Sequence, residues 1–374
     1  KCIIEFLRFW RKLFNPDIFK ILMPVYINSA SCISAQDTLD PDFFGLMNSE
    51  ISGNIISAKE PSYKEYIPPA MIRRMSKVVK MSAVTASRAL AEAGVKMPDA
   101  IITGTGMGCT EDSEKFLKNV IQNGEDFLTP TNFIQSTHNT VAGQIALGLN
   151  CHAYNFTYVN AATSLEFALL DAKLQIEFEG KKNILVGAAD ETARRTAELY
   201  QLAKIIKNKD DFPFDFLNSD SAGVLWGEGS SFFVLSPEKQ KSTYAELAAI
   251  ELVNHFAADE LQTETEKFLA KNSLERMDID AVLLGFSGDK TADEYHRNFS
   301  KIFRDAAQLY YKHLSGDFNT ASGVGYFMAS HILKQQTIPA VMKINSVEKN
   351  GVRNILIYNN FLGKDHSFTL LKKC

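Results

Sequence analysis

The stretch YVNAATSLEFALLDA, residues 158–172, joins a short polar turn to a strongly helical and largely apolar continuation. This pattern predicts a buried helix whose N-terminus presents one side chain from the preceding turn. Enzymes often place a nucleophilic cysteine at such a position, because the helix N-terminus lowers the pKa of the thiol. Here the predicted position holds Ala162, which has no nucleophilic atom.

Buried strands alternate with amphipathic helices on both sides of this stretch, which predicts an α/β layered fold. No linker rich in Gly, Pro or Ser divides the chain into independent domains. The predicted strands are 25–34, 99–109, 182–191, 230–236, 244–254, 280–288, 354–360 and 367–373, and the predicted helices are 73–94, 264–279, 292–313 and 323–336.

Composition excludes several classes of protein. The formal net charge of −4 gives no electrostatic basis for binding nucleic acid. No run of about 18 apolar residues exists, so the sequence predicts no membrane span. The five cysteines contain no CxxC pair and the seven histidines are dispersed, so we expect neither a disulfide framework nor a metal site, and no cofactor. A reducing cytoplasm is the expected location.

Residues 1–22 differ from the rest because they are both apolar and basic. They are read as an N-terminal extension of uncertain status: an amphipathic helix on a membrane surface is one interpretation, and a packed extension or upstream fragment is favoured over it. The remainder, 23–374, is predicted to be one domain with halves of about 23–238 and 239–374.

Several motifs are ambiguous when taken singly. The glycines of TGTGMGC, residues 103–109, lack the spacing of a nucleotide-binding loop, which favours a tight turn where backbones approach closely. Cys109, Cys151, His138 and Glu228 are each candidates for catalysis. Neither cysteine has a visible catalytic partner in the sequence, His138 fits a hydrogen-bonded structural histidine, and Glu228 fits the packing of a turn. A structural role is therefore favoured for all four.

Taken in order, seven stretches resemble the β-ketoacyl-acyl-carrier-protein synthases of the thiolase superfamily. The resemblance implies a five-layer α-β-α-β-α fold built from two similar halves, and a two-fold dimer. The seven stretches are RRMSKVVKMSAVTASRALAEAG, TGTGMGC, PTNFIQSTHNTVAGQIA, YVNAATSLEFALLDA, ILVGAADE, PFDFLNSDSAGVLWGEGSSFFVLS and KHLSGDFNTASG. They occur in the family's order, and the resemblance extends over nearly all of 23–374.

The family's chemistry, a decarboxylating condensation, uses a cysteine, two histidines and a supporting lysine. The resemblance puts Ala162 in the cysteine position, Gly285 in the position of the first histidine and Asp317 in that of the second, whereas Lys312 matches the lysine. The glycine-rich C-terminal loop that helps form the family's oxyanion hole is reduced to NNFLGKDHS, in which Asn359 and Phe361 match. The catalytic set is therefore predicted to be degenerate on a retained scaffold.

Within the family this character resembles the chain-length factors, inactive subunits that pair with an active synthase in polyketide or aryl-polyene and flexirubin-type pathways. The resemblance implies a heterodimer with an intact β-ketoacyl synthase, or a homodimer, acting with acyl carrier protein. Phe133, Phe156 and Phe167 are the candidate tunnel or interface residues. Two alternatives stay open: an active synthase with chemistry relocated to Cys109, Cys151 or His313, and a stand-alone protein that binds an acyl group or carrier.

Overall fold

The computed structural model describes residues 23–50, 53–126, 128 and 130–374. The predicted N-terminal extension, 1–22, lies outside these residues. Within the described part, no helix is long and apolar enough to cross a membrane.

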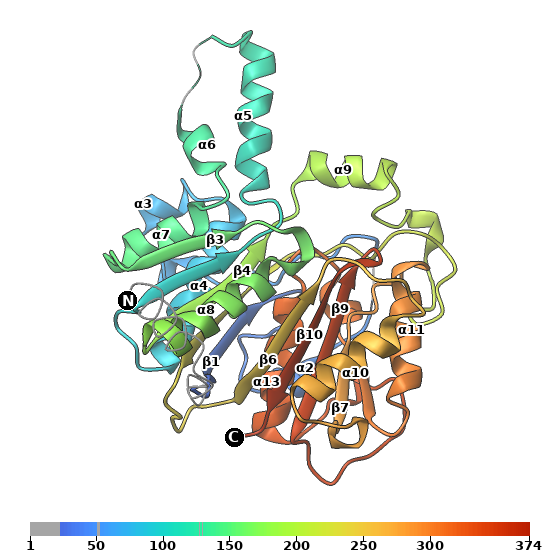
Figure 1. Cartoon of the computed structure of the whole chain (residues 1–374). Coiled ribbons are helices and arrows are strands. Elements are labelled where there is room, and N and C mark those ends of the chain that lie inside the picture. The colour runs from blue at the N-terminus through green and yellow to red at the C-terminus, as the bar shows by residue number, and fades with distance from the viewer. Residues whose placement is uncertain (1–22, 51–52, 127, 129) are drawn as a thin grey trace, which may run out of the picture.

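Ten strands form two half-sheets with the same internal order (Figure 1). The first half runs β3-β2-β4-β5-β1 and the second runs β8-β7-β9-β10-β6, so each strand of one half has a counterpart in the other. The halves join where Tyr26 and Ile27 of β1 pair with Glu246 and Ala245 of β6. The strands are β1 (Tyr26–Ile33), β2 (Ala100–Gly104), β3 (Tyr154–Tyr158), β4 (Ile184–Asp190), β5 (Gly229–Ser236), β6 (Ala245–Val253), β7 (Ala281–Leu284), β8 (Ala307–Tyr310), β9 (Asn354–Phe361) and β10 (Lys364–Lys372).

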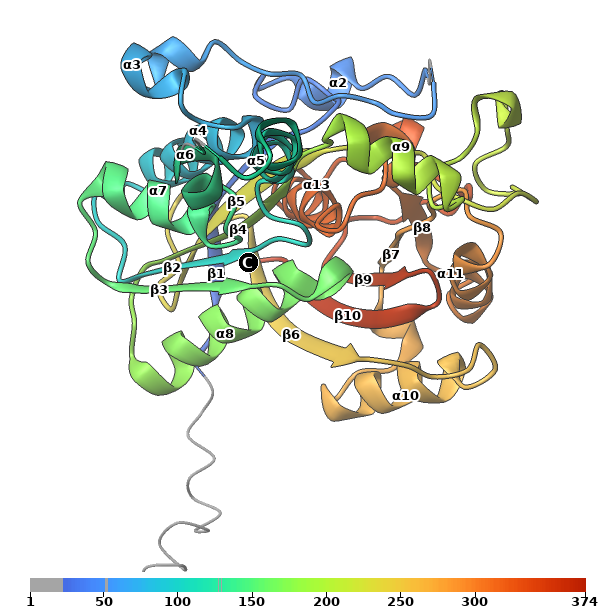
Figure 2. The same cartoon turned by 90° about the horizontal axis from the view of Figure 1, so that it is seen from above.

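Helices cover both faces of each half-sheet, because the strands are apolar on both sides. In β2, for example, Ile101 packs toward the outer helices and Ile102 toward the central ones. Figure 2 shows α4 and α8 on opposite sides of the first half-sheet, and α13 and α10 on opposite sides of β10. The outer helices are α4 (Lys77–Glu92), α7 (Thr140–Leu149), α10 (Leu261–Lys271) and α11 (Ala292–Ile302), and the central ones are α8 (Ser164–Glu179) and α13 (Ser322–Gln335). The predicted five-layer thiolase-like fold is confirmed.

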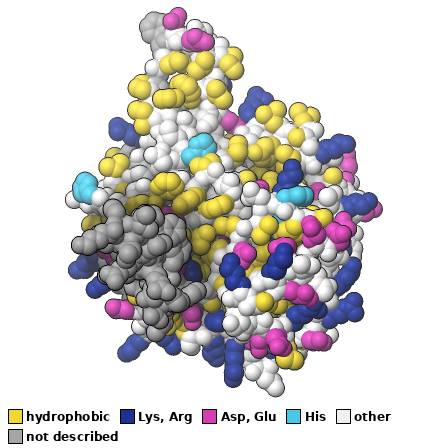
Figure 3. Space-filling view, in the orientation of Figure 1, with side chains coloured by type: hydrophobic (Ala, Val, Ile, Leu, Met, Phe, Trp, Pro, Cys, Tyr) yellow, Lys and Arg dark blue, Asp and Glu magenta, His cyan; other side chains and the backbone are white. Residues whose placement is uncertain are grey.

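A projection stands out from the layered body (Figure 1). It consists of α5 (Thr110–Asn123) and α6 (Pro130–Gln135), and α9 (Arg194–Leu202) lies beside its base. Apolar side chains are exposed along it, as Figure 3 shows, including Ile121, Phe133 and Ile134.

Several local predictions differ from the structure. The predicted helix 264–279 is wrong beyond Lys271, where α10 ends, and the predicted strand 99–109 is wrong beyond Gly104, where β2 ends. The predicted helix 292–313 is wrong beyond Ile302, because Ala307–Tyr310 forms strand β8, which pairs with β7 through Ala281 and Ala307. Strand β3 was not predicted. Both strands are short edge strands of five residues or fewer, and pairing with a neighbour from elsewhere in the chain overrides their weak local preference.

Candidate functional site

The turn at the start of α8 has a strained backbone and is largely buried. It is a single 3-10 turn, Ala161–Thr163, in which Ala161 has the left-handed φ of +44°. Non-glycine residues in this region cost energy and cluster at functional turns. The strained residue is one position before the predicted Ala162, which is itself buried. Both end in a methyl group, so the turn presents no nucleophile at either position.

The hydroxyl groups beside these alanines are used to build the turn. The Ser164 hydroxyl donates to the Thr105 carbonyl oxygen at 2.9 Å and accepts from the Asn160 backbone N–H at 2.8 Å. The Asn160 side chain in turn donates to the Thr163 hydroxyl oxygen at 2.7 Å. Neither hydroxyl is therefore free to replace a cysteine.

Glycine lets the turn lie against the sheet. A Cβ on Gly104, the last residue of β2, would lie 2.5 Å from the backbone of Ser164, so only glycine permits this approach. This supports the interpretation of TGTGMGC as a tight turn. Asp190 at the end of β4 then holds the glycine turn, accepting from the Thr105 hydroxyl at 2.8 Å and from the Gly106 backbone N–H at 3.0 Å. Sequence analysis missed Asp190, although an acidic residue at the end of a buried strand is a usable signal.

Glu166 lies fully buried in the first turn of α8. The Ser367 hydroxyl of β10 contacts one carboxyl oxygen at 3.5 Å, and the other has no partner among the described residues. Burial raises the pKa of Glu166 to about 7, against a smaller opposing effect from Ser322 and from the positive charge of Lys312. The turn of α8 and Lys312 thus share one buried region.

We expect the Glu166→Gln variant to be more stable than the parent at pH 8 and equally stable near pH 4.5. Because the pKa of Glu166 is higher in the folded than in the unfolded chain, the folded chain binds more protons between these values, and its stability falls as pH rises toward 7. The expected gain at pH 8 is about 3 kcal/mol. Urea unfolding of both proteins at the two pH values measures it, and an equal difference at both would contradict it.

Other side chains fill the space around Gly285, the predicted position of the first histidine. Gly285 directly follows β7, and a Cβ placed on it would lie 2.2 Å from Asn359 Oδ1 and 3.2 Å from Lys312 Cε. Asn359, on β9, is buried, and its Oδ1 has no hydrogen-bond partner within the described part of the chain. A histidine side chain does not fit at Gly285 unless Asn359 moves.

We expect Gly285→Ala to lower the free energy of unfolding by about 1–3 kcal/mol, because the added Cβ overpacks the core. In an Asn359→Ala background the same change is expected to cost less than about 1 kcal/mol, since the clashing atom is gone. Chemical denaturation of the four proteins in this double-mutant cycle gives the coupling. Equal costs in the two backgrounds would show that Asn359 does not occupy the position.

Asp317, at the predicted position of the second histidine, belongs to a buried ion pair. Lys312 Nζ lies 2.9 Å from Asp317 Oδ1, and the two side chains are 2% and 4% exposed. Burial raises the pKa of Asp317, and Lys312 opposes that effect. The backbone of Asp317 is fixed on both sides, because its N–H donates to Leu225 and its carbonyl accepts from Gly227. A carboxylate there repels a developing enolate oxygen, which a catalytic site must instead stabilise.

The C-terminal loop is a tight hairpin between β9 and β10. Its tip contains Leu362 and Gly363, both with left-handed φ values, and the Gly363 N–H donates to Asn360 Oδ1 at 3.0 Å. The matching residues Asn359 and Phe361 lie in β9, so the strand replaces the expected loop there.

The three predicted tunnel or interface phenylalanines fall in two places. Phe156 of β3 packs on Tyr158, with ring centroids 4.9 Å apart, and Tyr158 stacks on Phe167 of α8 at 5.9 Å. Phe133 instead lies on α6, where it packs on Phe116 of α5 at 5.3 Å. The structure thus brings Phe156 and Phe167 together and puts Phe133 on the projection.

The residues considered for relocated chemistry sit in unreactive surroundings. Cys109 is buried beside Glu191, and desolvation raises the pKa of its thiol to about 12. Cys151 is also buried. Desolvation lowers the pKa of His313 to about 3, its Nε2 contacts the Val341 carbonyl oxygen at 3.0 Å, and its ring stacks on Tyr310. Glu228 is likewise structural, because it binds Lys77 Nζ at 3.0 Å.

We expect Cys109 and Cys151 to resist alkylation in the folded protein, since only the thiolate reacts and both thiols are buried. Iodoacetamide treatment at pH 8, followed by mass spectrometry of peptides, measures labelling at each cysteine. The exposed Cys374 is the internal control. Rapid labelling of Cys109 or Cys151 in the native chain would contradict this and reopen relocated chemistry.

Two further observations bear on ligands. The described residues contain no cluster of three or more His, Cys, Asp or Glu side chains able to hold a metal ion. Four basic residues lie just before and within α4. Of these, Lys77 is bound to Glu228 and Lys80 lies over the Tyr63 ring, whereas Arg73 and Arg74 are exposed.

The sequence matches one family profile, that of the beta-ketoacyl synthase N-terminal domain, over residues 53–241. No curated protein sequence matches the chain.

Solved structures share the fold at low sequence identity. A β-ketoacyl synthase from Burkholderia phymatum STM815 has a TM-score of 0.77 at 14% identity, covering 94% of this chain and 100% of its own. The ishigamide ketosynthase/chain length factor has a TM-score of 0.75 at 17% identity, covering 94% and 99%. A ketosynthase in complex with its chain length factor from Xenorhabdus doucetiae has a TM-score of 0.72 at 15% identity, covering 95% and 99%.

Proposed function

The chain belongs to the β-ketoacyl synthase family, and from this premise we propose that it is a non-catalytic subunit of the chain-length-factor type, which pairs with an active synthase. One observation carries the proposal. The positions that the resemblance assigns to the family's cysteine and two histidines are closed by groups that cannot perform the chemistry: methyl groups at the α8 turn, Asn359 over Gly285, and Asp317, which is paired with the retained Lys312. The surrounding scaffold, including the Gly104 approach, is intact.

The face proposed for pairing is the free edge of β3. Among the described residues this strand ends the sheet and pairs with no strand but β2, so its outer backbone groups are available to another strand. Apolar side chains are exposed on β3 and on the two helices that flank it, which is unusual for a monomer's surface. They are Leu147 on α7, Tyr154 and Phe156 on β3, Val159 just after β3, and Leu174 and Phe178 on α8.

Pairing through this edge gives two of the predicted phenylalanines, Phe156 and Phe167, a steric role. Phe156 is 46% exposed at the edge, and it is joined through Tyr158 to Phe167 on the inner helix. A synthase bound there would contact these three aromatic side chains, which would then limit the length of the tunnel that holds the growing acyl chain. Because the family's homodimers use one patch twice, a diverged copy retains complementarity for an intact synthase.

Two of the similar structures are a ketosynthase with its chain length factor, which supports the pairing and favours a polyketide-type or polyene product. A third is a type II polyketide synthase acyl-carrier protein in complex with its ketosynthase, at a TM-score of 0.73 and 14% identity. We propose that acyl carrier protein delivers substrate to the pair. The free state of Cys32, Cys109 and Cys151 supports the reducing cytoplasm as its location.

The decisive experiment is purification of the full chain alone and co-expressed with an intact β-ketoacyl synthase of the same organism. Each preparation is assayed for malonyl decarboxylation and for condensation on acyl carrier protein. We expect an inert chain alone, and a stable 1:1 complex whose product length differs from that of the synthase by itself. Condensation by the lone chain would overturn the proposal. A chain that binds acylated carrier but no synthase would favour the stand-alone alternative.

A further inference from the structure

A cavity of about 480 Å³ opens where the two half-sheets separate. Strand β1 pairs with β5 from Tyr26 to Ile33, but with β6 only at Tyr26 and Ile27. Beyond Ile27, no strand of the described part of the chain lies beside the edge of β1 that faces β6. The space is walled by β1, α4, α13 and the segment 38–43, and its size is that of a small-molecule site.

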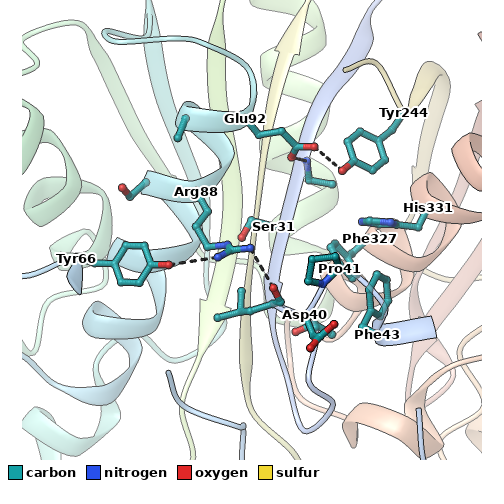
Figure 4. A pocket seen from close by; sticks show the side chains of 15 residues that line it. Ser31, Asp40, Pro41, Phe43, Tyr66, Arg88, Glu92, Tyr244, Phe327 and His331 are labelled. Carbon is teal, nitrogen blue, oxygen red and sulfur yellow. Dashed lines mark hydrogen bonds between the residues drawn. The ribbon is translucent and has the colours of Figure 1, made fainter. Parts of the chain in front are cut away.

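One end of this cavity carries a positive charge without a carboxylate partner. Arg88 reaches into it from α4, as Figure 4 shows, and donates to the Tyr66 hydroxyl at 3.3 Å and the Leu39 carbonyl at 3.1 Å. Both acceptors are neutral. No carboxylate lies within 4.0 Å of the Arg88 guanidinium in the part of the chain that the structure describes.

Both acidic residues that line the cavity accept hydrogen bonds from neighbouring groups. Glu92, one turn after Arg88, accepts from the Tyr244 hydroxyl at 2.5 Å with one oxygen and from the Ala30 backbone N–H at 3.3 Å with the other (Figure 4). The latter bond provides an acceptor for one backbone N–H, that of Ala30, on the edge of β1. Asp40 Oδ1 accepts from the Asp42 backbone N–H at 2.8 Å. Among the residues that line the cavity, Arg88 is the cationic side chain that can bind an anion.

The other end is aromatic. Phe43 and Phe327 pack together with ring centroids 5.0 Å apart, and His331 lies 4.8 and 4.4 Å from them. Desolvation lowers the pKa of His331 to about 3, so the ring is neutral at physiological pH and adds to an apolar surface. Ser31, 5% exposed in the wall between the two ends, has a hydroxyl with no hydrogen-bond partner among the described residues.

We propose that this cavity binds a small carboxylic acid with an aromatic or similarly compact apolar body. The carboxylate takes the two-pronged hydrogen bonds of the Arg88 guanidinium, a geometry that arginine offers and lysine does not. The apolar body packs on Phe43 and Phe327. Bound there, the acid joins the outer helix α4 to the central helix α13 across the gap between the half-sheets, at a place separate from the α8 turn.

The test is calorimetric titration of the full chain with three probes: phenylacetate, phenylacetamide and acetate. We expect saturable binding of phenylacetate, with the other two weaker by on the order of tenfold or more, because each lacks one of the two recognised groups. In Arg88→Met, phenylacetate is expected to bind no better than phenylacetamide. Arg304→Met, an exposed arginine in the second half, is the matched control and is expected to bind as the parent does.

A second variant keeps the test decisive if Arg88→Met does not fold. Ser87 is exposed at the cavity wall, so Ser87→Phe should fill the opening without disturbing the core, and it is expected to abolish phenylacetate binding. Failure of phenylacetate to bind the parent, or unchanged binding in either variant, would overturn the proposal. Equal binding of acetate and phenylacetate would overturn the aromatic half of it.

Discussion

Replacing Lys312 by Met is expected to lower the free energy of unfolding by about 3–5 kcal/mol. The ammonium group lies 2.9 Å from Asp317 Oδ1 in a site that excludes water. Its removal leaves the Asp317 carboxylate buried without its partner, and removing one member of a buried pair costs far more than the pair contributes. Chemical denaturation at pH 7, followed by circular dichroism, measures the loss.

The matched control is the double variant Lys312→Met with Asp317→Leu. It removes both charges and keeps a similar volume, so we expect it to recover most of the lost stability. Such a recovery would show that the pair has a structural role at this position, where the backbone of Asp317 is bonded to Leu225 and Gly227. A Lys312→Met variant within about 1 kcal/mol of the parent would mean that water reaches Asp317, and that the position is not closed as described.

Phe156→Asp is expected to weaken the complex with an intact synthase on the order of a hundredfold or more. An aromatic side chain at the centre of an interface contributes about 2–4 kcal/mol, and a carboxylate in its place is buried without a partner. The strand itself should survive, because Phe156 is almost half exposed and its neighbour Thr157 still bonds to Thr103 at 2.9 Å. Size-exclusion chromatography with light scattering, and surface plasmon resonance, measure the loss.

Met277→Asp is the control for this prediction. Met277 is 81% exposed and lies in the second half, away from β3, so the substitution adds the same charge without touching the proposed face. Its complex is expected to match that of the parent. If Phe156→Asp pairs as tightly as Met277→Asp does, the free edge of β3 is not the pairing face, and the exposed side chains of α5, α6 and α9 become the next surface to test.

The sequence alone was sufficient for the fold class, and it states that Ala161 and Ala162 stand in the turn before α8. Apolar strands and amphipathic helices carry strong periodic signals. The predicted helix 73–94 corresponds to α4, and its end lies close to the predicted one because Gly94 takes the left-handed conformation that ends a helix. The alanines of the α8 turn lack a nucleophilic atom wherever the chain places them. These properties depend on residue type and local pattern, which a sequence states directly.

Only the tertiary structure decided how the remaining positions are closed. No local pattern links Gly285 to Asn359, or the positive charge of Lys312 to the Glu166 carboxyl group. These residues meet through strand pairing and helix packing between distant segments. The same is true of strand β8, whose conformation comes from its pairing with β7, and of the cavity beside Arg88, which exists because β1 and β6 pair over only two residues. Contacts of this kind depend on the relative placement of whole elements, which side-chain periodicity does not encode.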